Sequence, residues 1–344
     1  MIWHPLLLAV LVMDFLSLLL IMASAVTALR TILGWSYPSA SREQIQLEIK
    51  AETAAILTRW ALAIFFASSI ALIIAITNVL PAVVPGAMCG TGVLQATHGL
   101  GSRALAFRLL AFSLAYFWHV LDQLNRIQPD SPLATATARI ILLLTPVFFL
   151  AFTGTTSAVF FLDVHQPVDC CAVVYDQVRS LAEAKSTGGI PDIYWIGGFI
   201  LGGVLTFAVG LRVWMSKSMP GCKATALLAA LSLAWLPVAS VALIRTLAAY
   251  YYGVLEHHCP WCLFLFEHHL VGYPLFGALA VAGLEGCACH VSAKVAETFP
   301  LLRSAAIDRS KKAGLRVAVA TVIFLILGGL PPLVWRLRFG VWMS

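Results

Sequence analysis

The stretch Trp60-Ala-Leu-Ala-Ile-Phe-Phe-Ala-Ser-Ser-Ile-Ala-Leu-Ile-Ile-Ala-Ile-Thr-Asn-Val-Leu80 contains no charged side chain. A helix of about 20 apolar residues is long enough to cross the hydrocarbon core of a bilayer. A strand of a transmembrane barrel would instead alternate apolar and polar residues over about ten positions, and this stretch does not alternate. It therefore predicts a membrane-spanning helix.

Similar apolar runs recur along the whole chain, of which 60% of residues are apolar and only 11% are charged. About a quarter of the residues of a typical globular domain are charged. Because backbone groups in lipid must be paired within each span, we expect an all-α, polytopic transmembrane helix bundle that forms one integral membrane domain over 1–344. The eight expected spans are 5–29, 56–80, 104–126, 138–161, 193–215, 224–251, 262–286 and 315–335.

Lysine and arginine are distributed unequally between the two sets of connections. The connections 30–59, 126–139, 211–223 and 287–316 hold fifteen basic residues, whereas the opposite set, with both ends of the chain, holds five. The positive-inside rule places the basic set in the cytoplasm and both termini outside it. We therefore expect an integral protein of the bacterial inner (plasma) membrane, in contact with lipid and without a nucleic-acid partner.

Some polar residues close to or within the spans carry more specific expectations. Asp14 lies inside the first span, and Arg108 or Arg245 could pair with it, since a charge in a membrane needs a partner. Ser41 and Gln44 form a capping-box pattern, which predicts a helical extension that leads into the second span.

The predicted topology divides the eight cysteines between two redox environments. Disulfides persist outside the cytoplasm, whereas cytoplasmic thiols are kept reduced. Cys222, Cys287 and Cys289 fall on the inner side, where Cys287, Cys289 and His290 could hold a metal if a fourth ligand came from elsewhere. The outer cysteines are Cys89, Cys170, Cys171, Cys259 and Cys262.

The longest outer connection, 162–192, carries two of these cysteines. Val174, Val178 and Leu181 recur in it at helical spacing. This pattern predicts an amphipathic helix on the outer membrane surface, which would hold Cys170 and Cys171 near the bilayer plane.

The densest group of reactive side chains is Glu-His-His-Cys-Pro-Trp-Cys-Leu-Phe-Leu-Phe-Glu-His-His, residues 256–269. Pro260 suits the first turn of a helix, so we expect the seventh span to begin here with Cys262 near its N-terminus, where a thiolate is favoured. On that helix His269 would lie about 20° from Cys262 and about 10 Å deeper, with Phe266 between them. That spacing suits a flat redox ring between thiol and imidazole.

Cys259-Pro-Trp-Cys262 at the outer end of a span resembles the quinone-linked, disulfide-forming membrane proteins of the DsbB and vitamin K epoxide reductase families. Glu267 and His268 are similar to the acidic-basic pair that follows the motif in DsbB. The resemblance implies that a thiol protein outside the cytoplasm passes electrons to a disulfide formed by Cys89 with Cys170 or Cys171. From there they would pass to Cys259 and Cys262 and then to a membrane quinone.

Two other functions fit the same residues. Outer histidines, above all His268 or His269 with His98 or His4, could be axial ligands of heme b in a respiratory subunit that binds heme or quinone and works with a partner redox subunit. Alternatively, His257, His258, Cys259 and Cys262 could bind zinc or copper as the entry site of a soft-metal binding or transport protein.

Overall fold

The structure is a computed structural model that describes residues 4–35, 41–127, 133–169, 191–254 and 257–343. All regular secondary structure in these ranges is helical, and eight of the helices are long and apolar enough to cross a membrane. The predicted all-α architecture is thereby confirmed, and the number of long apolar helices equals the number of predicted spans. The helices form two compact units, Met1–Pro85 with Val93–Gln166, and Gly86–Gly92 with Pro167–Ser344. The prediction of one domain over 1–344 concerns how these units associate and stays a prediction.

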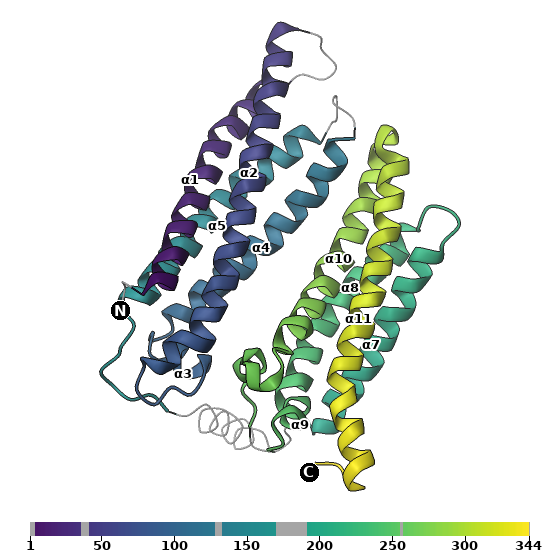
Figure 1. Cartoon of the computed structure of the whole chain (residues 1–344). Helices are drawn as coiled ribbons and strands as arrows, with labels where there is room; N and C mark the ends of the chain where they lie inside the picture. The colour runs from purple at the N-terminus through teal and green to yellow at the C-terminus, as the bar shows by residue number, and fades with distance from the viewer. Residues whose placement is uncertain (1–3, 36–40, 128–132, 170–190, 255–256, 344) are drawn as a thin grey trace. The chain divides into compact units, whose positions relative to one another are not determined.

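The first unit contains four long helices, which run alongside one another (Figure 1): α1 (Pro5–Gly34), α2 (Arg42–Ile74), α4 (Leu100–Asn125) and α5 (Ala134–Phe160). α1 packs against α2 and α5, and α4 packs against α5. Phe65, Trp118 and Phe148 are the largest side chains buried among these helices. Ser41 caps α2 by accepting a hydrogen bond from the backbone N–H of Gln44, which confirms the predicted helical extension.

A buried ion pair joins α1 to α4 inside this unit. Arg108 donates to the carboxylate of Asp14, and both side chains are almost fully buried. Ser68 donates to Asp14 over 2.5 Å, and Ser69 accepts from Arg108 over 2.7 Å. Arg108 is thus the partner of Asp14, while Arg245 pairs with Asp192 over 2.9 Å.

The second unit also contains four long helices: α7 (Asp192–Met215), α8 (Cys222–Ala242), α10 (Gly272–Thr298) and α11 (Arg303–Phe339). They pack in a closed ring in the order α7, α8, α10, α11, as Figure 1 shows for this half of the chain. Phe199, Trp235 and Phe324 contact one another in the core. Where α7 meets α11, a Cβ added at Gly210 would lie 2.9 Å from the carbonyl oxygen of Gly314. Only glycine permits this approach.

Short helices connect the long ones at one end of each unit. A π-helix, Ala75–Val79, and a 3-10 turn, Leu80–Ala82, follow α2, and α3 (Gly90–Gln95) precedes α4. A second π-helix, Leu243–Leu247, and α9 (Ala249–Tyr252) follow α8. π-Helical turns are rare and often lie at functional sites, and here each one leads into a connection that carries cysteine.

The seventh span differs from its prediction. Two 3-10 turns, Pro260–Phe264 and Phe266–His268, precede α10, which begins at Gly272 and not at 262. His269 and Leu270 adopt positive φ angles of 56° and 55°, which no α-helix tolerates. Cys262 therefore does not lie at the N-terminus of this span. The predicted amphipathic helix after the fourth span, with Cys170 and Cys171, lies outside the described residues.

Candidate functional site

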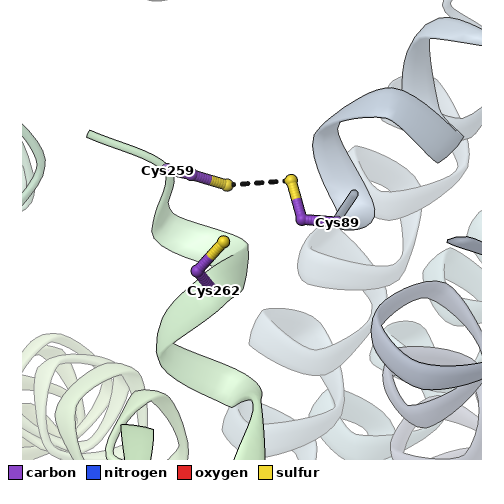
Figure 2. Close-up of side chains that lie close together, drawn as sticks. All are labelled: Cys89, Cys259 and Cys262. Carbon is purple, nitrogen blue, oxygen red and sulfur yellow. Dashed lines mark hydrogen bonds between the residues drawn. The ribbon is translucent and has the colours of Figure 1, made fainter. Parts of the chain in front are cut away.

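Three cysteines of the second unit meet in one place. Cys89 comes from the turn before α3, and Cys259 and Cys262 come from the 3-10 turn before α10. The Sγ atoms of Cys89 and Cys259 are 3.2 Å apart, and all three Sγ atoms lie within 4.8 Å of one another. Figure 2 shows the three side chains pointing into a common space. We call this group the three-cysteine cluster.

The cluster is shielded from solvent. Cys89 is 1% exposed, Cys259 is 0% exposed and Cys262 is 6% exposed. Leu265 and the rings of Tyr252 and Trp261 pack against the sulfur atoms. The three thiols are therefore buried and do not form an open thiol surface.

Glycines allow the Cys89 segment to fold tightly. Gly86 has a φ of 78°, and a Cβ there would lie 2.5 Å from the carbonyl oxygen of Val168. A Cβ at Gly92 would lie 2.9 Å from Cα of Ala87. Both positions need the absence of a side chain, so Gly-Ala-Met-Cys-Gly-Thr-Gly is a compact turn that presents Cys89.

The Cys259 segment is held by different contacts. Pro260 begins the 3-10 turn, where the missing N–H leaves no partner unsatisfied. The hydroxyl of Tyr252 donates to the carbonyl oxygen of Cys259 over 2.5 Å, and the backbone N–H of Leu265 donates to the carbonyl oxygen of Cys262 over 3.0 Å. These bonds fix both backbone positions of the C-x-x-C motif.

Thr91 and His257 are polar residues of the described ranges that contact the sulfur atoms. Thr91 Oγ1 lies 3.3 Å from Cys259 Sγ, and His257 Nε2 lies 3.2 Å from Cys262 Sγ. The ring of His257 packs edge-on against Tyr252, with 4.5 Å between the ring centroids. Burial lowers the pKa of His257, while the nearby Cys89 acts in the opposite direction and His268 and His258 reinforce the decrease. A neutral imidazole can donate electrons from Nε2 to a metal or accept a proton.

The histidines predicted in this region fall into different places. His258 is buried, and its Nδ1 lies 3.1 Å from the carbonyl oxygen of Ile244, in the π-helix that follows α8. His268 is partly buried against Tyr252, with 4.7 Å between ring centroids. Burial also lowers the pKa of His268, against the influence of Glu267. Of the predicted metal set, the structure brings His257, Cys259 and Cys262 together.

The predicted stacking of Cys262, Phe266 and His269 along one helix is wrong. Phe266 and Glu267 are exposed on the second 3-10 turn, and His269, which is also exposed, follows that turn in a left-handed conformation. The interpretation of a ring held between thiol and imidazole depended on continuous helical periodicity, which is absent here. Cofactor binding by these residues stays a prediction.

The other predicted residues are distributed as follows. His98 lies in the first unit, exposed and with a φ of 50°, so its pairing with His268 or His269 around heme stays a prediction.

On the side predicted to face the cytoplasm, Cys289 hydrogen-bonds to Ser310, whereas the ring of His290 lies 3.2 Å from Thr225 and 4.0 Å from Cys222. The inner set Cys287, Cys289 and His290 is therefore not gathered around one point.

Sequence reasoning missed two contributors to the site. Thr91 belongs to the Cys-Gly-Thr-Gly segment, but no spacing rule links it to Cys259, which is far along the chain. Tyr252 supports the Cys259 backbone and packs against the ring of His257. A tyrosine seven residues before a C-x-x-C motif was the available signal.

Comparison with known proteins adds no relative to this geometry. No protein-family model, curated protein or solved structure matches the chain.

Proposed function

We propose that the three-cysteine cluster and His257 form a soft-metal centre, so that the chain is a metal-binding membrane protein for zinc or copper. The observation that carries this proposal is the convergence of three sulfur atoms within 4.8 Å, with an imidazole nitrogen 3.2 Å from one of them. Three cysteines and one histidine are an established ligand set for tetrahedral Zn²⁺. Thiolate ligands also select Cu⁺.

The burial of the cluster supports a metal. Thiolates removed from water are costly unless a positive charge accompanies them, and a divalent or monovalent cation supplies that charge. His257, whose Nε2 lies 3.2 Å from Cys262 Sγ, is the candidate for a fourth donor atom. Thr91 and Tyr252 would then hold the ligands in place from outside the coordination sphere, as outer partners do in metalloproteins.

The predicted topology of the chain supports an extracytoplasmic role for the cluster. The connections that carry the cluster belong to the set that is poor in lysine and arginine, which the positive-inside rule places outside the cytoplasm. A soft-metal site at that surface would bind an ion before or after its passage through the envelope.

Metal analysis of the purified full-length protein tests the proposal. We expect about one zinc or copper ion per chain, and loss of most of it in Cys89→Ser, Cys259→Ser, Cys262→Ser and His257→Ala. Cys287→Ser is the matched control, because Cys287 lies on α10 outside the cluster. Cobalt loading should give thiolate-to-metal charge-transfer absorption in wild type and control only. Equal metal content in all five variants would contradict the proposal.

Thiol–disulfide exchange is the second candidate, and the 3.2 Å between the Sγ atoms of Cys89 and Cys259 favours it. The Cys89 thiolate would attack Sγ of Cys259 in a Cys259–Cys262 disulfide. The Cys89–Cys259 bond forms, the Cys259–Cys262 bond breaks, and Cys262 leaves as a thiolate, so the negative charge passes from Cys89 to Cys262. Net oxidation of a substrate dithiol would require a two-electron acceptor, for which the resemblance to the DsbB and vitamin K epoxide reductase families implies a membrane quinone.

Differential alkylation separates the two candidates. Metal-bound cysteines become reactive after a chelator is added to the denatured protein, whereas disulfide-bonded cysteines become reactive only after a reductant. We expect the chelator alone to expose Cys89, Cys259 and Cys262 to a maleimide reagent. Exposure only by reductant, in protein free of zinc and copper, would support the exchange reaction instead.

A further inference from the structure

The first unit contains a cavity of about 370 Å³ between α1, α2, α4 and α5. It lies where α1 and α4 end and α5 begins, at the opposite end of the unit from the connection that precedes α4. Glu48, Glu52, Trp118, Asn125 and Arg126 are among its lining residues. Ligand sites of small molecules commonly have about this volume and lie between helices of bundles.

Two buried polar atoms of the lining residues have no hydrogen-bond partner among the described residues. In the part of the chain that the structure describes, neither Trp118 Nε1 nor Asn125 Oδ1 has a hydrogen-bond partner. Trp118 is 0% exposed. Buried polar groups are nearly always hydrogen-bonded, so an indole N–H that lines a cavity indicates an acceptor inside it.

The charges around the cavity indicate that the same occupant is a cation. Asp122 is neutralised by Arg59, with two contacts of 3.1 Å, and by Arg126 at 3.4 Å. Glu48 and Glu52 lie one turn apart on α2, where like charges repel. Among the described residues Glu48 has no cationic partner and accepts only from the amide of Gln44, while Glu52 contacts Arg59 at 3.4 Å.

We propose that this cavity binds an ethanolamine-type group, a primary ammonium with an oxygen two carbons away. The ammonium donates hydrogen bonds to Glu48 and Glu52, and the oxygen accepts from the Trp118 indole N–H. Remaining ammonium hydrogens reach Asn125 Oδ1. A bare metal ion would not use the indole donor, and the cavity is far larger than one ion.

Two sources carry this group, a free amino alcohol and the headgroup of phosphatidylethanolamine. The full-length protein is placed in nanodiscs of phosphatidylcholine, whose quaternary ammonium donates no hydrogen bond. Ethanolamine and O-phosphoethanolamine are titrated while the thermal unfolding midpoint is recorded, since a ligand of the native state raises that midpoint. A second arm replaces part of the lipid with phosphatidylethanolamine and identifies retained lipid by native mass spectrometry.

Saturable stabilisation by either soluble probe supports a free solute, and stabilisation or retention only with phosphatidylethanolamine supports the lipid source. Trp118→Phe and Glu48→Gln should each weaken the effective agent at least about tenfold. The matched controls are Trp60→Phe and Glu43→Gln, both exposed on α2. If Trp118→Phe does not fold, Glu48→Gln decides the test. No response to any probe, or an unchanged response in Glu48→Gln, would overturn the proposal.

Discussion

Thr91 is the side chain whose role at the three-cysteine cluster is easiest to isolate. Its hydroxyl lies 3.3 Å from Cys259 Sγ, and Thr91→Val removes that group while nearly keeping the volume. Because groups that orient metal ligands typically contribute 10–100-fold to affinity, we expect Thr91→Val to weaken zinc binding by roughly that factor. Competition with a chromophoric chelator measures the change.

Thr153→Val is the matched control for this substitution, because its hydroxyl donates to the backbone of its own helix at an exposed position. An affinity of Thr91→Val equal to that of Thr153→Val would show that the hydroxyl does not support the metal ligands.

Asp14 and Arg108 permit a residue-level prediction that is independent of the cysteines. Asp14→Asn would leave the buried guanidinium of Arg108 without its counter-charge. Removal of one partner of a buried pair typically costs about 3–5 kcal/mol, so we expect a decrease of that size in the free energy of unfolding. Unfolding of the protein in mixed micelles by a denaturing detergent measures it.

The exposed pair of Asp308 and Lys312, at 2.7 Å, supplies the control. Asp308→Asn should change the unfolding free energy by less than about 1 kcal/mol. The double variant Asp14→Leu with Arg108→Met should regain part of the lost stability, since apolar replacement of a whole buried pair is often neutral. A double variant less stable than Asp14→Asn would argue against charge burial as the cause.

At the level of the elements, the contact between α7 and α11 depends on Gly210. A Cβ at this position would meet the carbonyl oxygen of Gly314, which belongs to a helix backbone and cannot rotate away. We expect Gly210→Val to lower the free energy of unfolding by about 1–3 kcal/mol. The same micelle assay applies.

Gly197 on the same helix is the control, because a Cβ there would contact nothing within 4 Å. Gly197→Ala should be neutral or should stabilise by up to about 1 kcal/mol, since alanine favours a helix over glycine. Equal effects of the two substitutions would refute close helix packing as the reason for Gly210.

The late start of α10 has a local signal in the sequence. Pro274 lacks a backbone N–H and would interrupt a helix that ran from 262 onward. In the structure it lies in the first turn of α10, where no intrahelical bond is lost. The residues before it form 3-10 turns and positive-φ positions, so Cys262 lies on a short turn, where it contacts His257, and not on the face of a long helix.

For the whole molecule, the two units share one order of elements. Along the sequence, two long helices, a π-helix at the end of the second, a connection that carries cysteine and two further long helices follow one another twice, and the long helices and π-helix of each series belong to one unit. The three-cysteine cluster combines the connections of both halves of the sequence, Cys89 from one and the C-x-x-C motif from the other.

Membrane orientation is a prediction about the whole chain. An even number of spans places both termini on one side, and the lysine and arginine distribution places that side outside the cytoplasm. An alkaline phosphatase fusion after Met343 should therefore be active, whereas a fusion at Lys217, between α7 and α8, should be inactive. The reverse pattern would invert the topology and would place the three-cysteine cluster in a reducing compartment.

The sequence by itself determined the helical class, the number of long apolar helices and the pairing requirement of Asp14, because apolar length and isolated charge act locally and need no knowledge of neighbours. It also selected Cys89, Cys259, Cys262 and His257 as candidates. Only the tertiary structure decided that Cys89 meets Cys259, that Thr91 joins them and that His258 and His269 do not. Those contacts join distant parts of the chain or depend on backbone turns, and side-chain spacing along one helix carries no information about either.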